Sequence, residues 1–244
     1  MSNSRVVWLA ADDPVDAFPP VAAALREPDG LLAAGGDLSK DRLLCAYRSG
    51  IFPWYDDGQP VLWWSPDPRC VFRPGDFHLS RRLRRDLRRS TAELRFNSSF
   101  RRVIDACAAP RASEQGTWIT PDMIAAYEAL HGDGWAHSIE IWQDGSLIGG
   151  LYGIAIGQAF FGESMFSSAA NASKMALLML SRMMESGDFG IIDCQVPSSH
   201  LLSQGATLLP RPSFIEMLKP LCEPAVRFEN WPSAPISVQA LVSG

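Results

Sequence analysis

The chain has 244 residues, of which 47% are hydrophobic and 20% are charged, and 22 Lys and Arg stand against 27 Asp and Glu for a formal charge of −5. This composition is typical of a globular protein with one or two domains and excludes a small scaffold held by disulfides. The five Cys form no C-x-x-C pair, which argues against a zinc ribbon and fits a reducing compartment. Without a signal peptide or a long apolar stretch, we expect a soluble, cytoplasmic monomer that does not bind membranes.

The first 70 residues are predicted to form a smaller domain of turns and short elements. Ser39 is placed to cap a helix that ends before Gly50. Prolines at positions 53, 60, 66 and 68 then argue against a long helix or a central strand. The aromatic residues of this stretch lie on rigid, irregular backbone and either belong to the core or stack on nucleic-acid bases. They are Trp54, Tyr55, Trp63 and Trp64.

Positive charge is concentrated between Arg69 and Arg111. This segment holds twelve Arg and no Lys against four acidic residues, so its formal charge is +8 and the remainder of the chain is strongly acidic. An acidic total gives no general affinity for nucleic acid. The basic segment therefore indicates a local site for a polyanion.

The densest positive charge lies in residues 81–89, where Ser80 is a helix N-cap and Leu83 and Leu87 are the only apolar positions. Several of the Arg are like charges four residues apart, and each such pair costs about 0.2–0.5 kcal/mol. The helix is therefore better suited to lie on phosphates, to which Arg offers forked contacts, than to stand alone. A solvated charged face is the alternative. The six basic residues are Arg81, Arg82, Arg84, Arg85, Arg88 and Arg89.

Residues 71–244 are predicted to form a second, larger domain that includes this Arg-rich helix. Thr120 and Pro121 begin another helix, which ends at Gly132. The apolar pattern then changes to period two, which is typical of half-buried strands joined by tight turns. We expect an antiparallel meander with strands at 137–142, 146–156 and 159–163.

The last predicted elements return the chain to the same sheet. Asn171 or Ser173 caps an apolar helix that runs from Lys174 to about Glu185, and a short strand follows at 191–196. A strand, helix and strand at this spacing form a βαβ crossover, which adds at least one parallel pair. We therefore predict an α+β fold with a mixed, mostly antiparallel sheet.

Asp193 and Gln195 interrupt this otherwise apolar strand. Because side chains alternate along a strand, both residues point to one face and Cys194 points to the other. An unpaired buried carboxylate is costly, so Asp193 must meet donors, water or a ligand. One interpretation is a structural Asp bonded to neighbouring backbone. We favour a functional site, because crevices form at the carboxyl ends of parallel strands.

Glu163 is the second polar anomaly, since its neighbours at the end of a predicted strand are apolar. It either attracts a cationic group of a substrate or pairs with an Arg. The sequence spacing of Cys194 and His200 does not support a nucleophile and its base. The four His form no H-E-x-x-H motif, so we expect no catalytic metal, and the sequence has no P-loop and no dinucleotide motif.

Nine sequence blocks, in their order and spacing, resemble the leucyl/phenylalanyl-tRNA–protein transferases from about Phe18 to Phe214. The blocks are REPDGLLA (26–33), GGDLS (35–39), GIFPW (50–54), LWWSPDPR (62–69), GTWIT (116–120), HSIE (137–140), GESMFS (162–167), NASK (171–174) and IDCQ (192–195). The resemblance implies an enzyme that moves Leu or Phe from the 3′ end of a charged tRNA to the α-amine of proteins beginning with Arg or Lys, which marks them for degradation. It also implies a carboxy-terminal domain with the fold of the GNAT acyltransferases behind a smaller N-terminal α/β domain.

The same resemblance implies roles for single residues. Asp193 and Gln195 match residues proposed to activate the attacking amine, and Glu163 matches one thought to read the basic N-terminal residue of the acceptor. An ester is already activated, and an α-amine titrates near pH ~7.7, so alignment of two substrates supplies about 7–11 kcal/mol and no cofactor is required. We expect Gln195 to orient the amine or the ester. Asp193 orients Gln195, or accepts a proton if burial raises its pKa.

Further matches concern the tRNA and the aminoacyl group. Trp54 and Trp118 match aromatic residues near the terminal adenosine, and the run Arg81–Arg89 matches the stretch that grips the acceptor stem. The family more usually has Met where this chain has Leu151 and Phe where it has Leu180, which leaves the preference between Leu and Phe open. The residues that match the amino-acid pocket are Leu151, Phe160, Met165, Leu177, Leu180 and Ile192.

Two other functions stay open at this point. One is a different acyltransferase on the same fold that uses coenzyme A, although the Q/R-x-x-G-x-G/A signature that cradles the coenzyme's pyrophosphate is missing from the crossover. The other is a non-catalytic RNA-binding module, for which Asp193 would be dispensable.

Overall fold

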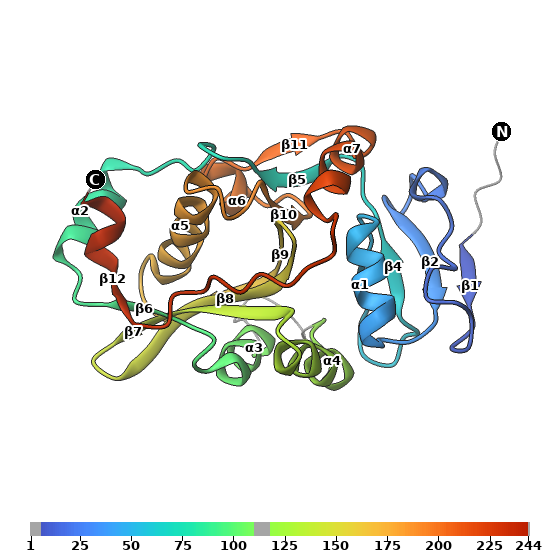
Figure 1. Ribbon diagram of the computed structural model, residues 1–244, viewed down its shortest axis with the longest axis horizontal. Coiled ribbons are helices and arrows are strands. Elements are labelled where there is room, and N and C mark those ends of the chain that lie inside the picture. Colours follow the sequence, from blue (N-terminus) through green and yellow to red (C-terminus); the bar gives the residue numbers. More distant parts are fainter. Residues whose placement is uncertain (1–5, 110–117, 244) are drawn as a thin grey trace.

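The computed structural model describes residues 6–109 and 118–243, and Figure 1 shows two sheets arranged along the long axis of the molecule. The smaller sheet belongs to an N-terminal unit, and α1 (Lys40–Arg48) packs beside it. Its first two strands pair in parallel and its other pairs are antiparallel. Its strands in spatial order are β1 (Val7–Leu9), β2 (Leu31–Gly35), β4 (Leu62–Trp64) and β3 (Phe52–Pro53), and a short 3-10 turn, η1 (Val21–Ala23), precedes β2.

The larger sheet has eight strands and is mixed. Among the described strands, β9 and β10 form its one parallel pair, and the other neighbours are antiparallel. This confirms the predicted α+β class with a mostly antiparallel sheet. The spatial order is β11 (Thr207–Leu209), β5 (Arg69–Phe72), β10 (Ile191–Gln195), β9 (Ala159–Ser167), β8 (Ser146–Ile156), β7 (Ala136–Gln143), β6 (Glu93–Phe96) and β12 (Ile236–Ser237).

Helices cover both faces of the larger sheet, because successive side chains point to opposite faces and the central strand β8 is apolar and buried on both of them. In Figure 1, α3 (Phe100–Ala108) and α4 (Pro121–Gly132) lie below the sheet, and α5 (Ala172–Glu185) lies above it. On β8, Tyr152 and Ile154 pack into the first core cluster with α3 and α4, whereas Leu151 and Ala155 pack into the second with α5.

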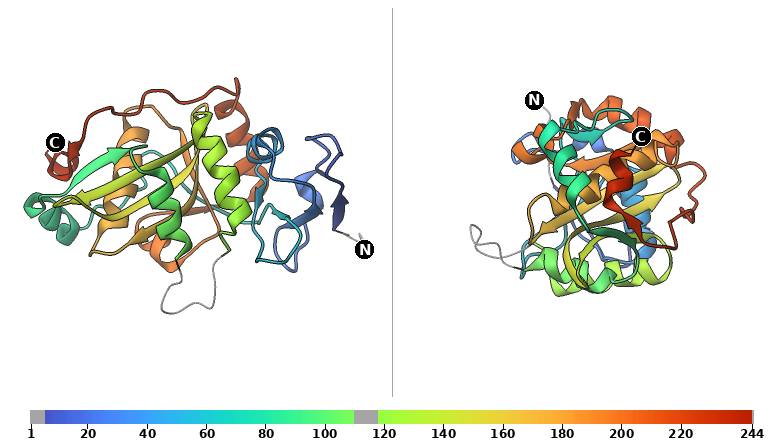
Figure 2. Two further views of the ribbon diagram at one scale, coloured as in Figure 1. Left: turned by 90° about the horizontal axis from the view of Figure 1, so that it is seen from below. Right: turned by 90° about the vertical axis from the view of Figure 1, so that its left-hand side faces the viewer.

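The remaining helices of the described ranges are α2 (Arg81–Arg89), α6 (Ser199–Ser203), α7 (Arg211–Leu221) and the 3-10 helix η2 (Val238–Val242). The segment after α7 runs along the molecule to its far end, where η2 packs against α2 (Figure 2). None of the helices in the described ranges is long and apolar enough to cross a membrane.

The N-terminal unit shares a core with the larger sheet. Tyr47 of α1 and Trp63 of β4 are fully buried in the same cluster as Tyr127 of α4 and Ile154 of β8. The chain enters the larger sheet at β5, which begins at Arg69.

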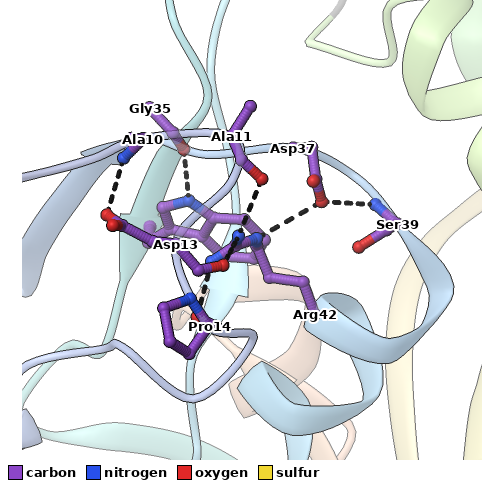
Figure 3. Close-up of polar contacts among 9 residues, drawn as sticks. Ala10, Ala11, Asp13, Pro14, Gly35, Asp37, Ser39 and Arg42 are labelled. Atoms are coloured by element: carbon purple, nitrogen blue, oxygen red, sulfur yellow. Dashed lines mark hydrogen bonds and ion pairs between the residues drawn. The ribbon is translucent and has the colours of Figure 1, made fainter.

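Arg42 fastens the start of the N-terminal unit to α1 (Figure 3). Its side chain is 1% exposed, and its guanidinium donates to the backbone carbonyls of Ala11, Asp13 and Pro14. Nε also donates to Asp37 Oδ1 at 3.3 Å, and the same oxygen accepts from the backbone N–H of Ser39. A buried guanidinium needs this many acceptors, because each unsatisfied N–H would cost about 1–3 kcal/mol.

The structure confirms some local predictions and corrects others. Ser80 and Thr120 cap α2 and α4 through their side chains, as predicted. Ser39 and Asn171 precede α1 and α5 but make no side-chain cap hydrogen bond. The prediction that the prolines exclude a central strand is wrong, because β4 fits between Pro60 and Pro66 and lies inside the smaller sheet. The sequence analysis did not identify α3, β5 or β6.

Candidate active site

A cavity of about 750 Å³ lies where the N-terminal unit meets the larger sheet, and we call it the junction cavity. Phe52 of β3 lines it on the N-terminal side, and Glu163 of β9 and Gln195 of β10 line it on the sheet side. His200 of α6 and Met165 of β9 also lie in its wall. The carboxyl ends of the parallel pair β9 and β10 therefore face one hollow, which is where α/β sheets usually hold ligands.

Glu163 is the only acidic residue among the described residues that line the junction cavity. It is 9% exposed, and three side chains donate hydrogen bonds to it: Tyr47 to Oε1 at 2.7 Å, Tyr127 to Oε2 at 2.8 Å and Gln195 Nε2 to Oε1 at 2.8 Å. Burial raises the pKa of Glu163 to about 7, and the three donors hold it from rising further. The carboxyl group therefore changes charge near neutral pH.

Tyr47 and Tyr127 approach Glu163 from two different helices, α1 and α4. Both are fully buried, and their hydroxyl groups also hydrogen-bond to each other. Burial, followed by the charge of Glu163, raises the pKa of both phenols well above its usual value, so they remain protonated donors. Neither contact is apparent from the sequence, since 36 and 116 residues separate Tyr127 and Tyr47 from Glu163.

Gln195 reaches Glu163 because the backbone of β10 is irregular at its end. The register against β5 shifts between Asp193 and Gln195, and Gln195 adopts a left-handed conformation with φ of 62°. Such a conformation is uncommon for a residue other than glycine and costs of order 1–3 kcal/mol. Cys194 packs against the second core cluster and also lines the junction cavity, whereas Asp193 does not line it, so the predicted regular alternation of faces does not hold at this irregular strand end.

Asp193 forms a buried ion pair with Arg69 and is not among the residues that line the junction cavity. Arg69 Nε donates to Oδ1 at 2.8 Å and Nη2 donates to Oδ2 at 2.7 Å, while the backbone N–H of Gln195 donates to Oδ1 at 2.9 Å. Asp193 thus contacts the backbone of Gln195 rather than its carboxamide. This geometry suits a carboxylate that positions Gln195.

Arg69 is in turn held by the N-terminal unit. Its Nη1 donates to the carbonyl of Gly50 at 3.1 Å, and its guanidinium lies 4.7 Å from the ring centre of Phe52 and 4.8 Å from that of Phe214. The sequence analysis counted Arg69 in the basic segment, but its side chain is 1% exposed, so it belongs to the core and offers no surface charge.

The predicted aromatic residues separate into core and surface. Trp63 and Tyr55 are buried, whereas Trp54 is 40% exposed and lines the junction cavity together with Trp118. Trp64 fixes the orientation of Trp54 by donating from Nε1 to its carbonyl at 2.6 Å. Trp54 and Trp118 thus border the cavity with aromatic side chains, and such side chains are the kind on which nucleic-acid bases stack.

The predicted amino-acid pocket is divided in the structure. Met165 lines the junction cavity. The other members are at most 4% exposed and belong to the second core cluster. The structure therefore brings only Met165 of this set to the cavity wall, and the rest lie behind it. The members of the predicted pocket that do not line the cavity are Leu151, Phe160, Leu177, Leu180 and Ile192.

The Arg-rich helix α2 presents its charge to solvent. Leu83 and Leu87 are buried, and the side chains of Arg82 and Arg85 are 84% and 60% exposed. Asp86 is the acidic residue of the helix and accepts a hydrogen bond from Asn171 at the start of α5. Arg81, Arg88 and Arg89 are exposed and Arg84 is partly so, whereas Arg111 lies outside the described residues.

Cys194 and His200 both line the junction cavity, yet they are not poised for nucleophilic catalysis. Burial raises the pKa of the Cys194 thiol well above its usual value, so the reactive thiolate is disfavoured. Burial also lowers the pKa of His200. In the described parts of the chain, no group of three or more His, Cys, Asp or Glu side chains is arranged to hold a metal ion.

Comparison with known proteins defines the class of protein first. The chain is 57% identical over 209 residues to the leucyl/phenylalanyl-tRNA–protein transferase of Azoarcus sp. (strain BH72), which covers 86% of this chain and 88% of that protein. It is 52% identical over 214 residues to the enzyme of the same name from Nitrosomonas eutropha, with 88% and 92% covered. These relatives are aminoacyltransferases.

Family comparison then gives a more specific assignment. The family described as leucyl/phenylalanyl-tRNA protein transferase matches residues 71–219, and the N-terminal domain of the same family matches residues 36–67. This chain belongs to the leucyl/phenylalanyl-tRNA–protein transferase family. Among solved structures, a ribosomal-protein-alanine N-acetyltransferase from Brucella melitensis aligns with a TM-score of 0.33 at 15% identity, over 59% of this chain and 97% of that one.

Proposed function

We propose that this protein transfers Leu or Phe from an aminoacyl-tRNA to the α-amine of proteins that begin with Arg or Lys. Membership of the family supports the reaction, and one observation carries the choice of acceptor: Glu163 is the acidic group of the junction cavity within the described chain. A buried carboxylate that ionises near neutral pH attracts a cationic acceptor. Its pKa of about 7 lies close to the ~7.7 of an α-amine.

In the proposed reaction the nitrogen of the acceptor amine attacks the ester carbonyl carbon. A new amide bond forms, the bond from that carbon to the ribose oxygen breaks, and the ribose oxygen leaves as a hydroxyl after taking the proton that the attacking nitrogen loses. Since the ester is already activated, holding both substrates in one cavity is the main contribution, worth about 7–11 kcal/mol. The proposed reaction requires no cofactor.

Three side chains have distinct roles in this proposal. Glu163 takes a proton from the incoming ammonium and leaves it able to attack. Gln195 donates through Nε2 to Glu163, which leaves its Oε1 to accept an N–H of the amine. Asp193, paired with Arg69, is a positioning residue that holds the left-handed backbone of Gln195 in place. Protonation of Asp193 would break a buried ion pair, which argues against a role as general base.

We further propose that the RNA substrate lies between α2 and the junction cavity. The exposed Arg side chains of α2 bind phosphates of the acceptor stem, Trp54 and Trp118 stack on the terminal adenosine, and Met165 begins the pocket for the aminoacyl side chain. The finer fold assignment is part of the same proposal: a GNAT-like domain from residue 71 onward, in which β9, α5 and the parallel strand β10 form the crossover.

A transfer assay tests the proposed reaction. The protein is incubated with radiolabelled Leu-tRNA and a peptide that begins with Arg, and a peptide with Ala in place of that Arg is the matched control. We expect label in the Arg peptide and little in the Ala peptide. Absence of label, while a related transferase in the same assay works, would reject the function. Binding of acetyl-CoA in calorimetry would instead favour the coenzyme A alternative.

Replacement of Arg84, Arg85 and Arg88 by Ala tests the RNA-binding face. Each lost phosphate contact lowers the slope of log K against log salt by about 0.7–0.9, so we expect weaker tRNA binding and a slope that is smaller by roughly two to three. Filter binding between low and moderate salt measures both. An unchanged slope would show that these side chains do not contact phosphate.

A further inference from the structure

The strand β1 lies at the outer edge of the smaller sheet (Figure 1). It pairs in parallel with β2, and the carbonyl of Leu9 accepts from the N–H of Gly36 at 2.8 Å. Because successive residues of a parallel strand direct their backbone groups to opposite sides, the N–H and carbonyl of Trp8 point to the outer edge. In the described ranges no other strand pairs with this edge. The edge of β1 can therefore accept one more strand.

Trp8 is the most exposed large apolar side chain among the described residues, at 67%, and its neighbours Val6 and Val7 are exposed as well. Leu9 is buried in the first core cluster, so alternation puts the indole ring of Trp8 on the other face of the strand. The ring lies over Gly35, where a Cβ would be 3.1 Å from Cε2 of Trp8. An exposed indole beside an open strand edge is typical of a surface that binds a partner.

A cavity of about 410 Å³ lies beside Trp8, and we call it the edge cavity. It is lined by β1 and the turn that follows it, by Tyr55 and Gln59 from the segment after β3, and by Asp122 of α4. Asp122 is the only charged residue among the described residues that line it. The edge cavity thus offers a largely uncharged wall with one carboxylate.

The edge cavity adjoins the junction cavity at two places. Trp54 lines the junction cavity and the next residue, Tyr55, lines the edge cavity, and the Cα atoms of successive residues are only about 3.8 Å apart. On the other side, Trp118 lines the junction cavity and Asp122 lines the edge cavity. The hydroxyl groups of Tyr55 and Thr120 hydrogen-bond at 3.2 Å between them. A polypeptide that leaves the junction cavity over Trp54 therefore reaches the edge cavity directly.

The N-terminal unit is acidic, in contrast to the Arg-rich helix α2 at the other end of the molecule (Figure 1). Residues 1–68 hold ten acidic and five basic residues. Asp12, Asp56 and Asp57 are exposed in the two turns that line the edge cavity. In the described ranges neither these three nor Asp122 forms an ion pair. This charge favours a cationic partner and disfavours RNA.

We propose that the edge cavity and the open edge of β1 bind the acceptor polypeptide downstream of its N-terminal residue, as an extended and basic segment. The inference rests on the proposed function, in which the N-terminal residue itself lies at Glu163. The segment pairs with the backbone of Trp8, packs an apolar side chain on the indole ring, and directs basic side chains to Asp122 and the neighbouring carboxylates. Among proteins that begin with Arg or Lys, those with an unfolded, basic N-terminal segment are then preferred.

Three acceptor peptides that all begin with Arg test this surface. The short peptide ends about two residues after the Arg, and the two long peptides continue for about 14 residues, roughly 46 Å when extended, with either Lys or Glu at the same downstream positions. Transfer from radiolabelled Leu-tRNA is measured against peptide concentration. We expect the long Lys peptide to have a KM about tenfold lower than the other two, with a similar kcat, because the added contacts bind the peptide without touching the reacting atoms.

Trp8→Ala removes the indole from an exposed position, so the fold should tolerate it. It should raise the KM of the long Lys peptide about fivefold or more, the effect of losing one aromatic anchor, and change that of the short peptide less than about twofold. Leu208→Ala is the matched control, because Leu208 is an exposed apolar residue on β11, the edge strand of the larger sheet, and lines neither cavity. It should leave both KM values unchanged.

Charge variants test the choice of a basic segment. Replacing Asp56, Asp57 and Asp122 together by Asn should reduce the preference for Lys over Glu in the long peptides and weaken its dependence on salt. Glu216→Gln removes an exposed carboxylate from α7, which lines neither cavity, and should leave the preference intact. A preference that survives the triple replacement would overturn the electrostatic part of the inference.

The outcomes distinguish this surface from the proposed function. If wild type labels all three peptides with the same KM, or if Trp8→Ala raises the KM of the short and the long Lys peptide equally, the surface is rejected and the function stands. If wild type labels no peptide while a related transferase in the same assay does, the function is rejected and the inference with it. Sedimentation tests another occupant: a dimer that Trp8→Ala dissociates would assign the edge of β1 to a second copy of the chain and overturn the inference.

Discussion

Two buried carboxylates 30 residues apart in the sequence have opposite environments in this protein. Glu163 lies in the wall of the junction cavity and receives its hydrogen bonds from neutral donors, two phenols and a carboxamide. Asp193 lies behind that wall, and the guanidinium of Arg69 donates a hydrogen bond to each of its two carboxylate oxygens. Because the donors to Glu163 are neutral, burial dominates its pKa, which is about 7. The carboxylate of Asp193 is instead compensated by the full positive charge of Arg69.

This difference shows how one strand pair can supply both a titrating group and a fixed one. Glu163 lies in the middle of β9, just beyond its parallel pairing with β10, and Asp193 is on β10, yet only Glu163 borders the space that substrates would enter. A group that must gain and lose a proton is best placed where its charge is only partly compensated. A group that must hold a strained backbone is best placed in an ion pair.

The largest effect is expected when the ion pair loses its positive partner. Arg69→Met leaves Asp193 buried without a charge to meet it, which should lower the free energy of unfolding by about 3–5 kcal/mol. Denaturation in urea measures the loss. Because the Asp193 carboxylate also holds the backbone of Gln195, transfer activity should fall with it.

A double variant sharpens this prediction. Arg69→Met combined with Asp193→Asn removes both charges, so it should recover part of the stability lost in the single variant. If the double variant were as unstable as the sum of the two single ones, the pair would contribute through packing rather than charge.

The next effect concerns Glu163 and pH. Its folded pKa of about 7 lies above the value of 4.5 expected when it is exposed, so the folded protein holds this proton more tightly than the unfolded chain. Stability should therefore fall as pH rises from 4.5 to 7, by on the order of 3 kcal/mol, and this penalty should remain constant at higher pH.

Glu163→Gln is the matched control, because it is nearly isosteric and has no charge to bury. The difference in unfolding free energy between wild type and variant should grow between pH 4.5 and 7, with the variant relatively more stable at the upper end. Urea denaturation across this pH range measures it. A difference independent of pH would contradict the assignment of a titrating Glu163.

The smallest effect is expected when one phenol is removed. Tyr127→Phe deletes a donor to the ionised form of Glu163, so the pKa of Glu163 should rise further, by roughly one unit for one hydrogen bond to a charged group. The acid limb of the pH–rate profile of transfer should shift upward accordingly. Tyr152→Phe, which removes a hydroxyl without a hydrogen-bond partner among the described residues, is the control and should leave the limb in place.

Elements with strong local signals could be predicted from the sequence. For α2 and α4, a side-chain N-cap precedes apolar residues at helical spacing, and both helices begin where these signals put them. The strands β7 and β8 follow from their alternation and the turn at Asp144 and Gly145. By contrast, β4 is three residues long and owes its place inside a sheet to pairing with β2 and β3, which no local pattern reveals.

The site was predictable where a single residue was out of place. Glu163 and Gln195 are polar residues in apolar strands, and the structure brings both to the same cavity. Their partners were not predictable, because Tyr47, Tyr127 and Arg69 fit ordinary patterns of a core helix or a basic segment. What makes them special is contact across 36 to 124 residues of chain, which depends on tertiary packing.

The N-terminal unit contributes Tyr47 to Glu163, the Gly50 carbonyl and the Phe52 ring to Arg69, and Trp54 to the cavity. The eight-residue stretch 47–54 thus contacts both Glu163 and Arg69 and lines the cavity. A chimera that joined this sheet to the N-terminal unit of a distant relative would be inactive unless these four positions matched. We therefore expect the N-terminal unit and the larger sheet to change together in evolution and not to be exchangeable between distant relatives.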